Sequence, residues 1–158
     1  MDIIESDLNI KGRKFAIILS RFNEFIGSQL LEGALDCLSK KGVKDDNIVL
    51  IKVPGAFEIP IAAEKLAETG KYSVIICLGA VIRGGTPHFE YVAGAAATGI
   101  QTVSLKYGIP VVFGILTTDN VEQAIERAST KKMNKGWDAA MTAIEMGCLM
   151  DKIENKQG

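Results

Sequence analysis

The stretch from Val74 to Ile82 is apolar throughout, with Gly79 as its only interruption. A strand with one exposed face alternates apolar and polar residues, so an unbroken apolar run predicts a strand covered on both faces. Strands of this kind lie at the centre of parallel sheets. The chain must therefore supply helices for both faces of that sheet.

Shorter strand-like runs alternate with segments of helical spacing along the rest of the chain. The strand-like runs cover residues 15–19, 48–53 and 111–116, and helices are expected over 26–38, 58–69, 88–106, 121–128 and 137–148. Asp119 and Glu122 fit a capping box for the fourth of these helices. The alternation predicts right-handed crossovers and a three-layer α/β/α fold, with helices on both faces of a four-stranded parallel sheet.

Length and charge indicate one domain over residues 1–158 without general affinity for polyanions. Of the 158 residues, 47% are hydrophobic and 23% charged, which fits a compact domain and excludes disorder. Lysine plus arginine (18) nearly balances aspartate plus glutamate (19), so neither nucleic acid nor an anionic membrane is an expected partner. The apolar runs fall far short of the ~20 residues that a membrane helix needs.

The cysteines, the N-terminus and the histidine bear on compartment and metal binding. Cys37, Cys77 and Cys148 are odd in number and set in apolar patterns, which predicts buried, reduced thiols. The first residues are acidic and lack the layout of a secretion signal, so a cytoplasmic location is expected. Because His88 is the only histidine, a histidine-rich metal site is excluded, and no metal or other cofactor is expected.

Two end segments lie outside the alternating pattern. The N-terminal arm, residues 1–13, carries Ile3, Ile4, Leu8 and Ile10, enough for an extra edge strand without an evident partner in the chain. We expect this strand to join the sheet of a neighbouring subunit. Residues 152–158 are expected to form a charged tail after the last helix.

Ligands of parallel sheets bind where strands end and helices begin, so the loops there are candidate sites. The loop 20–24 lacks the glycines of a dinucleotide site, and its Phe22 fits either a hydrophobic staple or a stacking platform for a flat heterocycle. In the next such loop, Gly55 and Ala56 leave the backbone open to a ligand. Glu58 fits either hydroxyl binding or a favourable charge at a helix start.

The loop before the third helix carries the most informative pattern. Its glycine pair, 84–85, permits unusual backbone angles, while Thr86 is a good N-cap and Pro87 suits the first helical position. The free amides of such a helix start form an anion site. His88 follows directly and is either a general acid–base or an ordinary polar residue, with Glu90 or solvent as its partner.

Arg127 is placed about 12 Å along its helix from Asp119, which points it away from an anion site of its own subunit. It is therefore either a solvated surface charge or a ligand of a pocket in an adjoining subunit. Lys131, Lys132 and Lys135 either extend such a basic patch or mark a solvated helix end.

Taken in order, these segments resemble the lumazine synthase family of riboflavin biosynthesis. The resemblance runs from about Phe15 to Met150. The segments that carry it are Arg21–Asn23, Pro54–Pro60, Gly79–Gly84 with Thr86 and His88, Phe113–Gly114 with Thr117–Thr118, and Glu122–Ala128. Each motif alone is weak, and their agreement in register makes chance improbable. The resemblance implies a flavodoxin-like fold.

The resemblance also implies a reaction. 5-Amino-6-(ribitylamino)uracil condenses with 3,4-dihydroxy-2-butanone 4-phosphate to give 6,7-dimethyl-8-ribityllumazine, with loss of phosphate and water. None of these steps requires a metal or redox cofactor. By similarity, His88 moves protons, Phe113 closes the pocket and Lys135 lies nearby.

Binding roles follow from the same resemblance. The implied substrate-binding residues are Phe22, Asn23, Ala56, Phe57, Glu58, Ala80, Val81, Ile82, Gly85, Thr86, Phe113, Arg127 and Lys135. Phe22 stacks on the pyrimidinedione, residues 56–58 hold the ribityl chain and residues 80–82 hold the ring edge. Residues 85–86 take the phosphate together with Arg127 of the next subunit.

The bend before the last helix departs from the family pattern. Ser129 and Met133 stand where the family usually has glycine, in a segment that the resemblance links to assembly. A homopentamer with shared sites is implied, because Arg127 needs a neighbour. The segment keeps the family length without a proline insertion, which favours closure of pentamers into a sixty-subunit shell. Association with riboflavin synthase is a further partner that the resemblance suggests.

Three alternative functions would each require a different set of residues. A related riboflavin synthase, which joins two lumazines, needs no phosphate site, so Thr86 and Arg127 count against it. A non-catalytic flavin-binding or shell-forming protein has no need of His88 or Arg127. A flavodoxin-like electron carrier requires a phosphate-binding loop directly after the first strand.

Overall fold

The structure is a computed structural model that describes residues 1–129 and 133–157. In chain order its elements are β1 (Phe15–Ser20), α1 (Glu24–Lys40), η1 (Asp45–Asn47), β2 (Ile48–Val53), η2 (Ala56–Glu58), α2 (Ile59–Glu68), β3 (Val74–Ile82), α3 (His88–Tyr107), β4 (Val111–Thr118), α4 (Val121–Arg127) and α5 (Lys135–Gln157).

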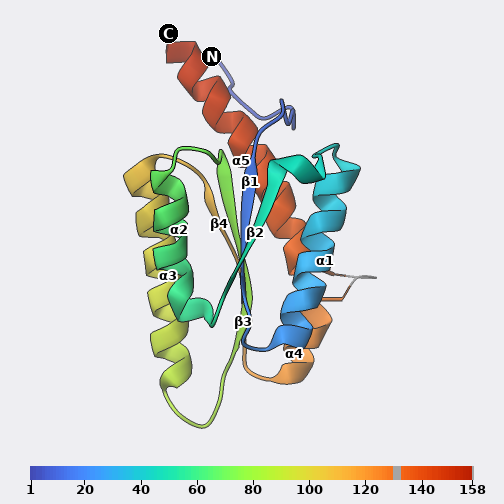
Figure 1. Cartoon of the computed structure of the whole chain (residues 1–158), viewed down its shortest axis with the longest axis vertical. Helices are drawn as coiled ribbons and strands as arrows, with labels where there is room; N and C mark the ends of the chain where they lie inside the picture. Colours follow the sequence, from blue (N-terminus) through green and yellow to red (C-terminus); the bar gives the residue numbers. More distant parts are fainter. Residues whose placement is uncertain (130–132, 158) are drawn as a thin grey trace.

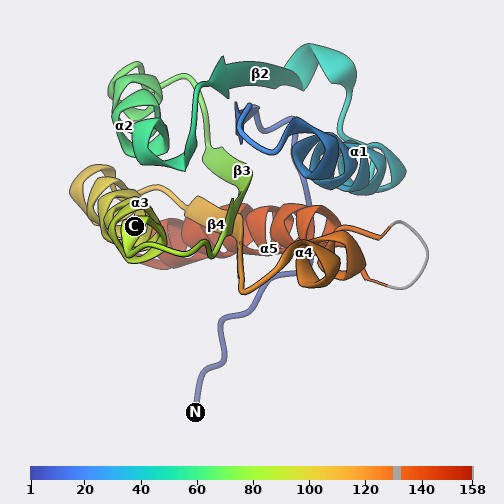
Figure 2. The same cartoon turned by 90° about the horizontal axis from the view of Figure 1, so that it is seen from below.

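The strands form one parallel sheet in the order β2-β1-β3-β4. Helices α2 and α3 cover one face, and α1, α4 and α5 cover the other, as Figures 1 and 2 show. The predicted α/β/α architecture is thereby confirmed. The strand β3 lies inside the sheet with its predicted bounds, and β4 runs past the predicted Leu116 to Thr118.

Alternate residues of the inner strands enter two separate hydrophobic cores. Phe15, Ile17 and Leu19 of β1 pack beneath α1 and α5, whereas Ala16 and Ile18 pack beneath α2 and α3. Full burial of each large aliphatic side chain contributes about 1.5–3 kcal/mol. Both faces of β1 and β3 are therefore apolar because both are covered, which explains the unbroken run in β3.

Two predicted helix caps shift by one residue. The residue before α3 is Pro87 rather than Thr86, and no side chain caps that helix start. At α4 the cap is Asn120 rather than Asp119, since the Oδ1 of Asn120 accepts from the N–H of Gln123 at 2.9 Å. The carboxylate of Asp119 instead accepts from Arg83, which leaves the next residue to cap the helix.

Both ends of the chain lie toward the end of the molecule remote from the loop between β3 and α3 (Figure 1), although Figure 2 shows that they are well apart there. Helix α5 continues to Gln157, so residues 152–157, predicted as a tail, belong to it. Residues 1–10 form neither helix nor strand. The arm is attached to α5 through Asp7, whose carboxylate lies 3.3 Å from the Nζ of Lys152, and through an ion pair between Arg13 and Asp151.

The three cysteines are free and buried, as predicted. Burial raises the pKa of the Cys37 thiol to about 11 and raises that of Cys77 further. None of the helices in the described part of the chain is both long and apolar enough to span a membrane.

Candidate functional site

A hollow of about 580 Å³ opens where β1 and β3 end and α3 begins. Its lining residues are Phe22, Asn23, Pro54, Gly55, Ala56, Phe57, Glu58, Ala80, Val81, Ile82, His88, Phe89, Tyr91 and Val92. The structure thus brings together the predicted site residues of three strand-end loops and the histidine. It places them at the carboxyl edge of the sheet, where ligands of this fold class bind.

The loop after β1 is held to its neighbours by hydrogen bonds that extend the sheet pairing. The N–H of Phe22 donates to the carbonyl of Pro54 at 3.1 Å, and the amide of Asn23 donates to the carbonyl of Ala80 at 3.1 Å. Asn23 takes a left-handed backbone conformation (φ 60°), which short polar side chains tolerate. Phe22 is 72% exposed, so its ring stands at the rim rather than packing as a staple.

The loop after β2 offers a mixed apolar and acidic wall. Ala56 is buried beneath it, Phe57 is 61% exposed, and Glu58 is half-buried. The N–H of Glu58 donates to the carbonyl of Gly55 at 3.2 Å, which closes the short helix η2. A carboxylate and an exposed ring therefore face the hollow from one turn.

The loop 84–87 is bridged at its two ends by an ion pair. The guanidinium of Arg83 contacts the carboxylate of Glu90, and its Nε donates to the Oδ1 of Asp119 at 3.0 Å. The guanidinium also lies 4.4 Å from the centre of the Phe89 ring. Glu90 is thus the partner of Arg83 and not of His88. The hydrogen bond from Arg83 holds the pKa of Glu90 below its usual value of 4.5.

The remaining predicted residues fall into two groups. Gly85 and Thr86 lie exposed in the loop that leads to His88, and no atom lies within 4 Å of a Cβ built on Gly85. Phe113 and Lys135 instead line a second hollow, of about 320 Å³, between β4 and α5. The chain's own fold therefore does not bring these two residues into the first hollow.

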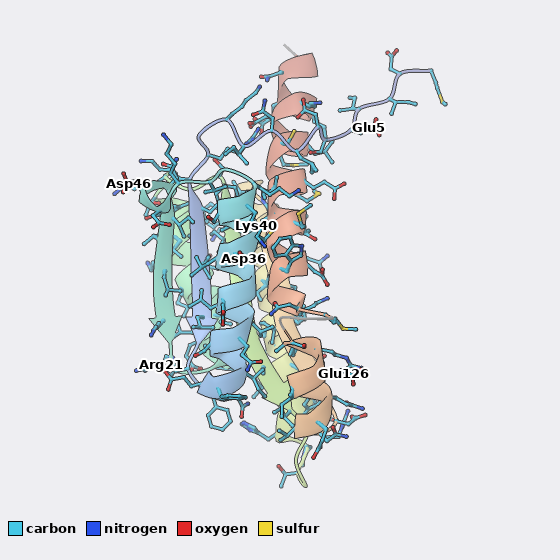
Figure 3. The ribbon with its side chains drawn as sticks, turned by 90° about the vertical axis from the view of Figure 1, so that its right-hand side faces the viewer. Glu5, Arg21, Asp36, Lys40, Asp46 and Glu126 are labelled. Atoms are coloured by element: carbon cyan, nitrogen blue, oxygen red, sulfur yellow. The ribbon has the colours of Figure 1, made fainter. Side chains whose placement is uncertain are left out.

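Arg127 is the last residue of α4 and does not line the first hollow. In Figure 3, Glu126, the preceding residue, and Arg21, beside the first hollow, are labelled on opposite sides of the lower end of the molecule. The predicted Lys131 and Lys132 lie outside the described residues.

Sequence reasoning missed part of the wall and the ion-pair cluster. Tyr91 and Val92 line the first hollow three and four positions after His88, a spacing that places them on the same helix face. That spacing could have been read from the sequence. Within the described chain, no group of three or more His, Cys, Asp or Glu side chains is arranged to hold a metal ion.

Comparison with known proteins identifies the family to which this chain belongs. Residues 12–151 match the family described as 6,7-dimethyl-8-ribityllumazine synthase. A protein of that name from Desulfatibacillum aliphaticivorans is 60% identical over 152 residues, which cover 96% of this chain and 98% of the relative. Another of that name, from Clostridium kluyveri, is 57% identical over 154 residues, or 98% of this chain and 100% of the relative. The chain belongs to the 6,7-dimethyl-8-ribityllumazine synthase family.

Proposed function

We propose that this protein condenses 5-amino-6-(ribitylamino)uracil with 3,4-dihydroxy-2-butanone 4-phosphate to form 6,7-dimethyl-8-ribityllumazine, phosphate and water. The observation that carries the proposal is the first hollow, where Phe22, residues 56–58, residues 80–82 and His88 meet in a member of this family. The exposed ring of Phe22 is a stacking platform for the pyrimidinedione. Glu58 and the neighbouring backbone face the ribityl hydroxyls, while the end of β3 borders the ring.

The phosphate end of the second substrate belongs at the loop 84–87. Residues 85–86 are exposed there, next to the start of α3, and a helix start attracts anions. The one cation at this loop, Arg83, is already paired with the two carboxylates of Glu90 and Asp119. A dianionic phosphate therefore needs a further cation from elsewhere.

Arg127 of a second copy supplies that cation in our proposal. Arg127 and Lys135 are exposed, and neither forms an ion pair with any carboxylate that the structure describes. Phe113 lies on the edge strand β4 and is 37% exposed. These three residues would complete the site of an adjoining subunit.

Exposed apolar side chains support association of subunits. Ile61 of α2 and Tyr91 and Leu105 of α3, two helices that pack against each other, are all more than half exposed, and Leu105 reaches 78%. Such side chains mark interaction surfaces when they gather on a soluble domain. We place the chain in a cytoplasmic homopentamer, with the arm 1–13 added to a neighbour's sheet. Closure into a sixty-subunit shell and association with riboflavin synthase extend the same proposal.

The chemistry requires positioning and proton transfer. The ring amine attacks the ketone carbon and loses water to give an imine, phosphate then leaves, and the ribitylamino nitrogen closes the second ring with loss of water. Holding two reactants in attack geometry can supply about 7–11 kcal/mol of the barrier reduction. His88, at the border between the hollow and the phosphate loop, transfers protons between these steps.

Co-assembly of two defective variants tests the shared site. His88→Ala damages one half of each site and Arg127→Ala the other, so each variant alone should form lumazine slowly. When the two are unfolded, mixed in equal amounts and reassembled, about one quarter of the sites should regain both intact halves. Lumazine formation is followed by its absorbance.

The controls are the two variants taken separately through the same unfolding and reassembly. If the mixture is no more active than the average of the separately reassembled variants, the site lies within one chain and the proposal is wrong. If Arg127→Ala alone is fully active, Arg127 has no part in the reaction.

A further inference from the structure

The amide of Asn134 joins three helices. Its Nδ2 donates to the carbonyl of Gln29 on α1 and to that of Ala128 at the end of α4, both at 3.1 Å. Its Oδ1 accepts from the N–H of Trp137 in the first turn of α5 at 3.0 Å. Asn134 is only 9% exposed, so these bonds form in a protected junction, where each is costly to lose.

Two glycines give the junction its space. A Cβ atom on Gly33 of α1 would overlap the side-chain amide of Asn134. A Cβ atom on Gly136 of α5 would overlap the carbonyl oxygen of Leu30, so α5 begins in direct contact with the backbone of α1. The close approach of the two helices depends on this pair of glycines.

The junction needs an asparagine side chain. One short group must present two N–H donors and one acceptor, and only a carboxamide has both. Aspartate could still accept from Trp137 but could donate to neither carbonyl. Serine has a single donor, and glutamine is one methylene longer than the space occupied by Asn134.

The residues beside the junction are two of those assigned to the phosphate subsite. Arg127 immediately precedes Ala128, whose carbonyl Asn134 binds, and Lys135 immediately follows Asn134. Helix α4 has only 7 residues, too few to be stable alone. Asn120 caps its first turn, and Asn134 binds the carbonyl of Ala128, the residue directly after its last turn.

We propose that Asn134 is a positioning residue for phosphate binding, because it ties the end of α4 to the start of α5 and so presents Arg127 and Lys135 to the neighbouring subunit's anion loop. This inference rests on the proposed function. It assigns Asn134 no contact with substrate. Its effect must therefore pass through the two cations, which makes it separable from a general loss of stability.

The test compares Asn134→Asp with the parent protein in the assembled enzyme. Aspartate keeps the size of the side chain and the cap of α5 but removes both donated bonds. We expect kcat/KM for the butanone phosphate to fall by about tenfold to a hundredfold, as for a misplaced binding group. The KM for the ribitylaminouracil should stay within about twofold, since its pocket lies on other elements.

A double-mutant cycle with Arg127→Ala separates positioning from simple destabilisation. If Asn134 acts through Arg127 and Lys135, adding Asn134→Asp to Arg127→Ala should lower kcat/KM less than Asn134→Asp does in the parent protein, because one of the two positioned groups is already gone. Fully additive losses, or equal losses for both substrates, would overturn the inference. If Arg127→Ala itself changes nothing, the assignment of Arg127 to the phosphate site fails instead.

Two further variants serve as matched tests. Gly33→Ala should reproduce the Asn134→Asp phenotype with the amide still present, because the added methyl displaces it. Asn120→Ala removes the cap at the opposite end of α4 from Arg127 and should leave kcat/KM for the butanone phosphate nearly unchanged. Sedimentation checks that each variant assembles, and Asn134→Ser replaces Asn134→Asp if the latter does not. A normal kcat/KM for the butanone phosphate in Gly33→Ala would also contradict the inference.

Discussion

The contact between Ser20 and Gly79, at the carboxyl edge of the sheet, predicts that substitutions at these two positions have strongly non-additive effects on the free energy of unfolding. Ser20 is 1% exposed, and its Oγ has no hydrogen-bond partner among the described residues. A Cβ atom on Gly79 of the adjacent strand would overlap that Oγ, while its distance to the Cβ of Ser20 would be 3.2 Å. The hydroxyl is therefore the group that keeps position 79 a glycine.

Gly79→Ala should lower the free energy of unfolding by about 1–3 kcal/mol, the usual cost of overpacking a core. Ser20→Ala removes a buried unpartnered hydroxyl and should raise it by about 1 kcal/mol. In the double variant the two methyl groups would lie 3.2 Å apart, tight but tolerable after a small shift. The double variant should therefore recover most of the loss, with a coupling of about 1–3 kcal/mol.

Urea unfolding at one fixed protein concentration measures these values, because association contributes to the stability of an oligomer. Gly114→Ala is the matched control. A Cβ atom there would lie 2.8 Å from the backbone carbonyl oxygen of Cys77, a contact that Ser20→Ala cannot relieve. If Gly79→Ala is equally destabilising with and without Ser20→Ala, the steric argument is wrong.

Three further predictions concern chemistry rather than packing. His88→Ala should slow lumazine formation by about 10²–10⁴-fold without abolishing it, as rapid-mixing absorbance would show; an inert variant that still binds both substrates would contradict a catalysis based on positioning. Arg83→Met should return the pKa of Glu90 toward 4.5 in a carboxyl NMR titration, because the hydrogen bond from Arg83 favours the charged carboxylate. In the parent protein this ion pair is present at neutral pH and is lost as pH falls through the lowered pKa. At pH 8 the Cys37 and Cys77 thiols of the native protein should resist a disulfide reagent and react after denaturation, since burial raises both pKa values, that of Cys37 to about 11; rapid native labelling of either would refute this.

The strands could be predicted because burial on both faces leaves a local trace in the sequence. The run 74–82 has no polar position, and it occupies the inside of the sheet as expected. The helix caps were less predictable. Asp119 and Asn120 are both good capping residues, and the choice between them depends on Arg83, which lies 36 positions away and binds Asp119.

The loops of the first hollow could be located from the sequence, but the contacts that fix them could not. The bond from Asn23 to Ala80 spans 57 positions, and that from Asn134 to Gln29 spans 105. Every residue has a backbone carbonyl, so the sequence does not show which carbonyl the side chain of Asn23 or Asn134 binds. Long-range hydrogen bonds to backbone groups therefore could not be predicted from the sequence.

The proposed division of the site between two copies of the chain rests on charge as much as on geometry. Arg83 lies at the phosphate loop, yet it is committed to Glu90 and Asp119, and this network keeps the two ends of the loop together. A cation that holds the loop in place is less available to neutralise the ligand. In our proposal, the exposed cations Arg127 and Lys135 of a second copy fill that need. Under that proposal, the ion-pair network that holds the loop within one chain is also the reason why the site needs a cation from another chain.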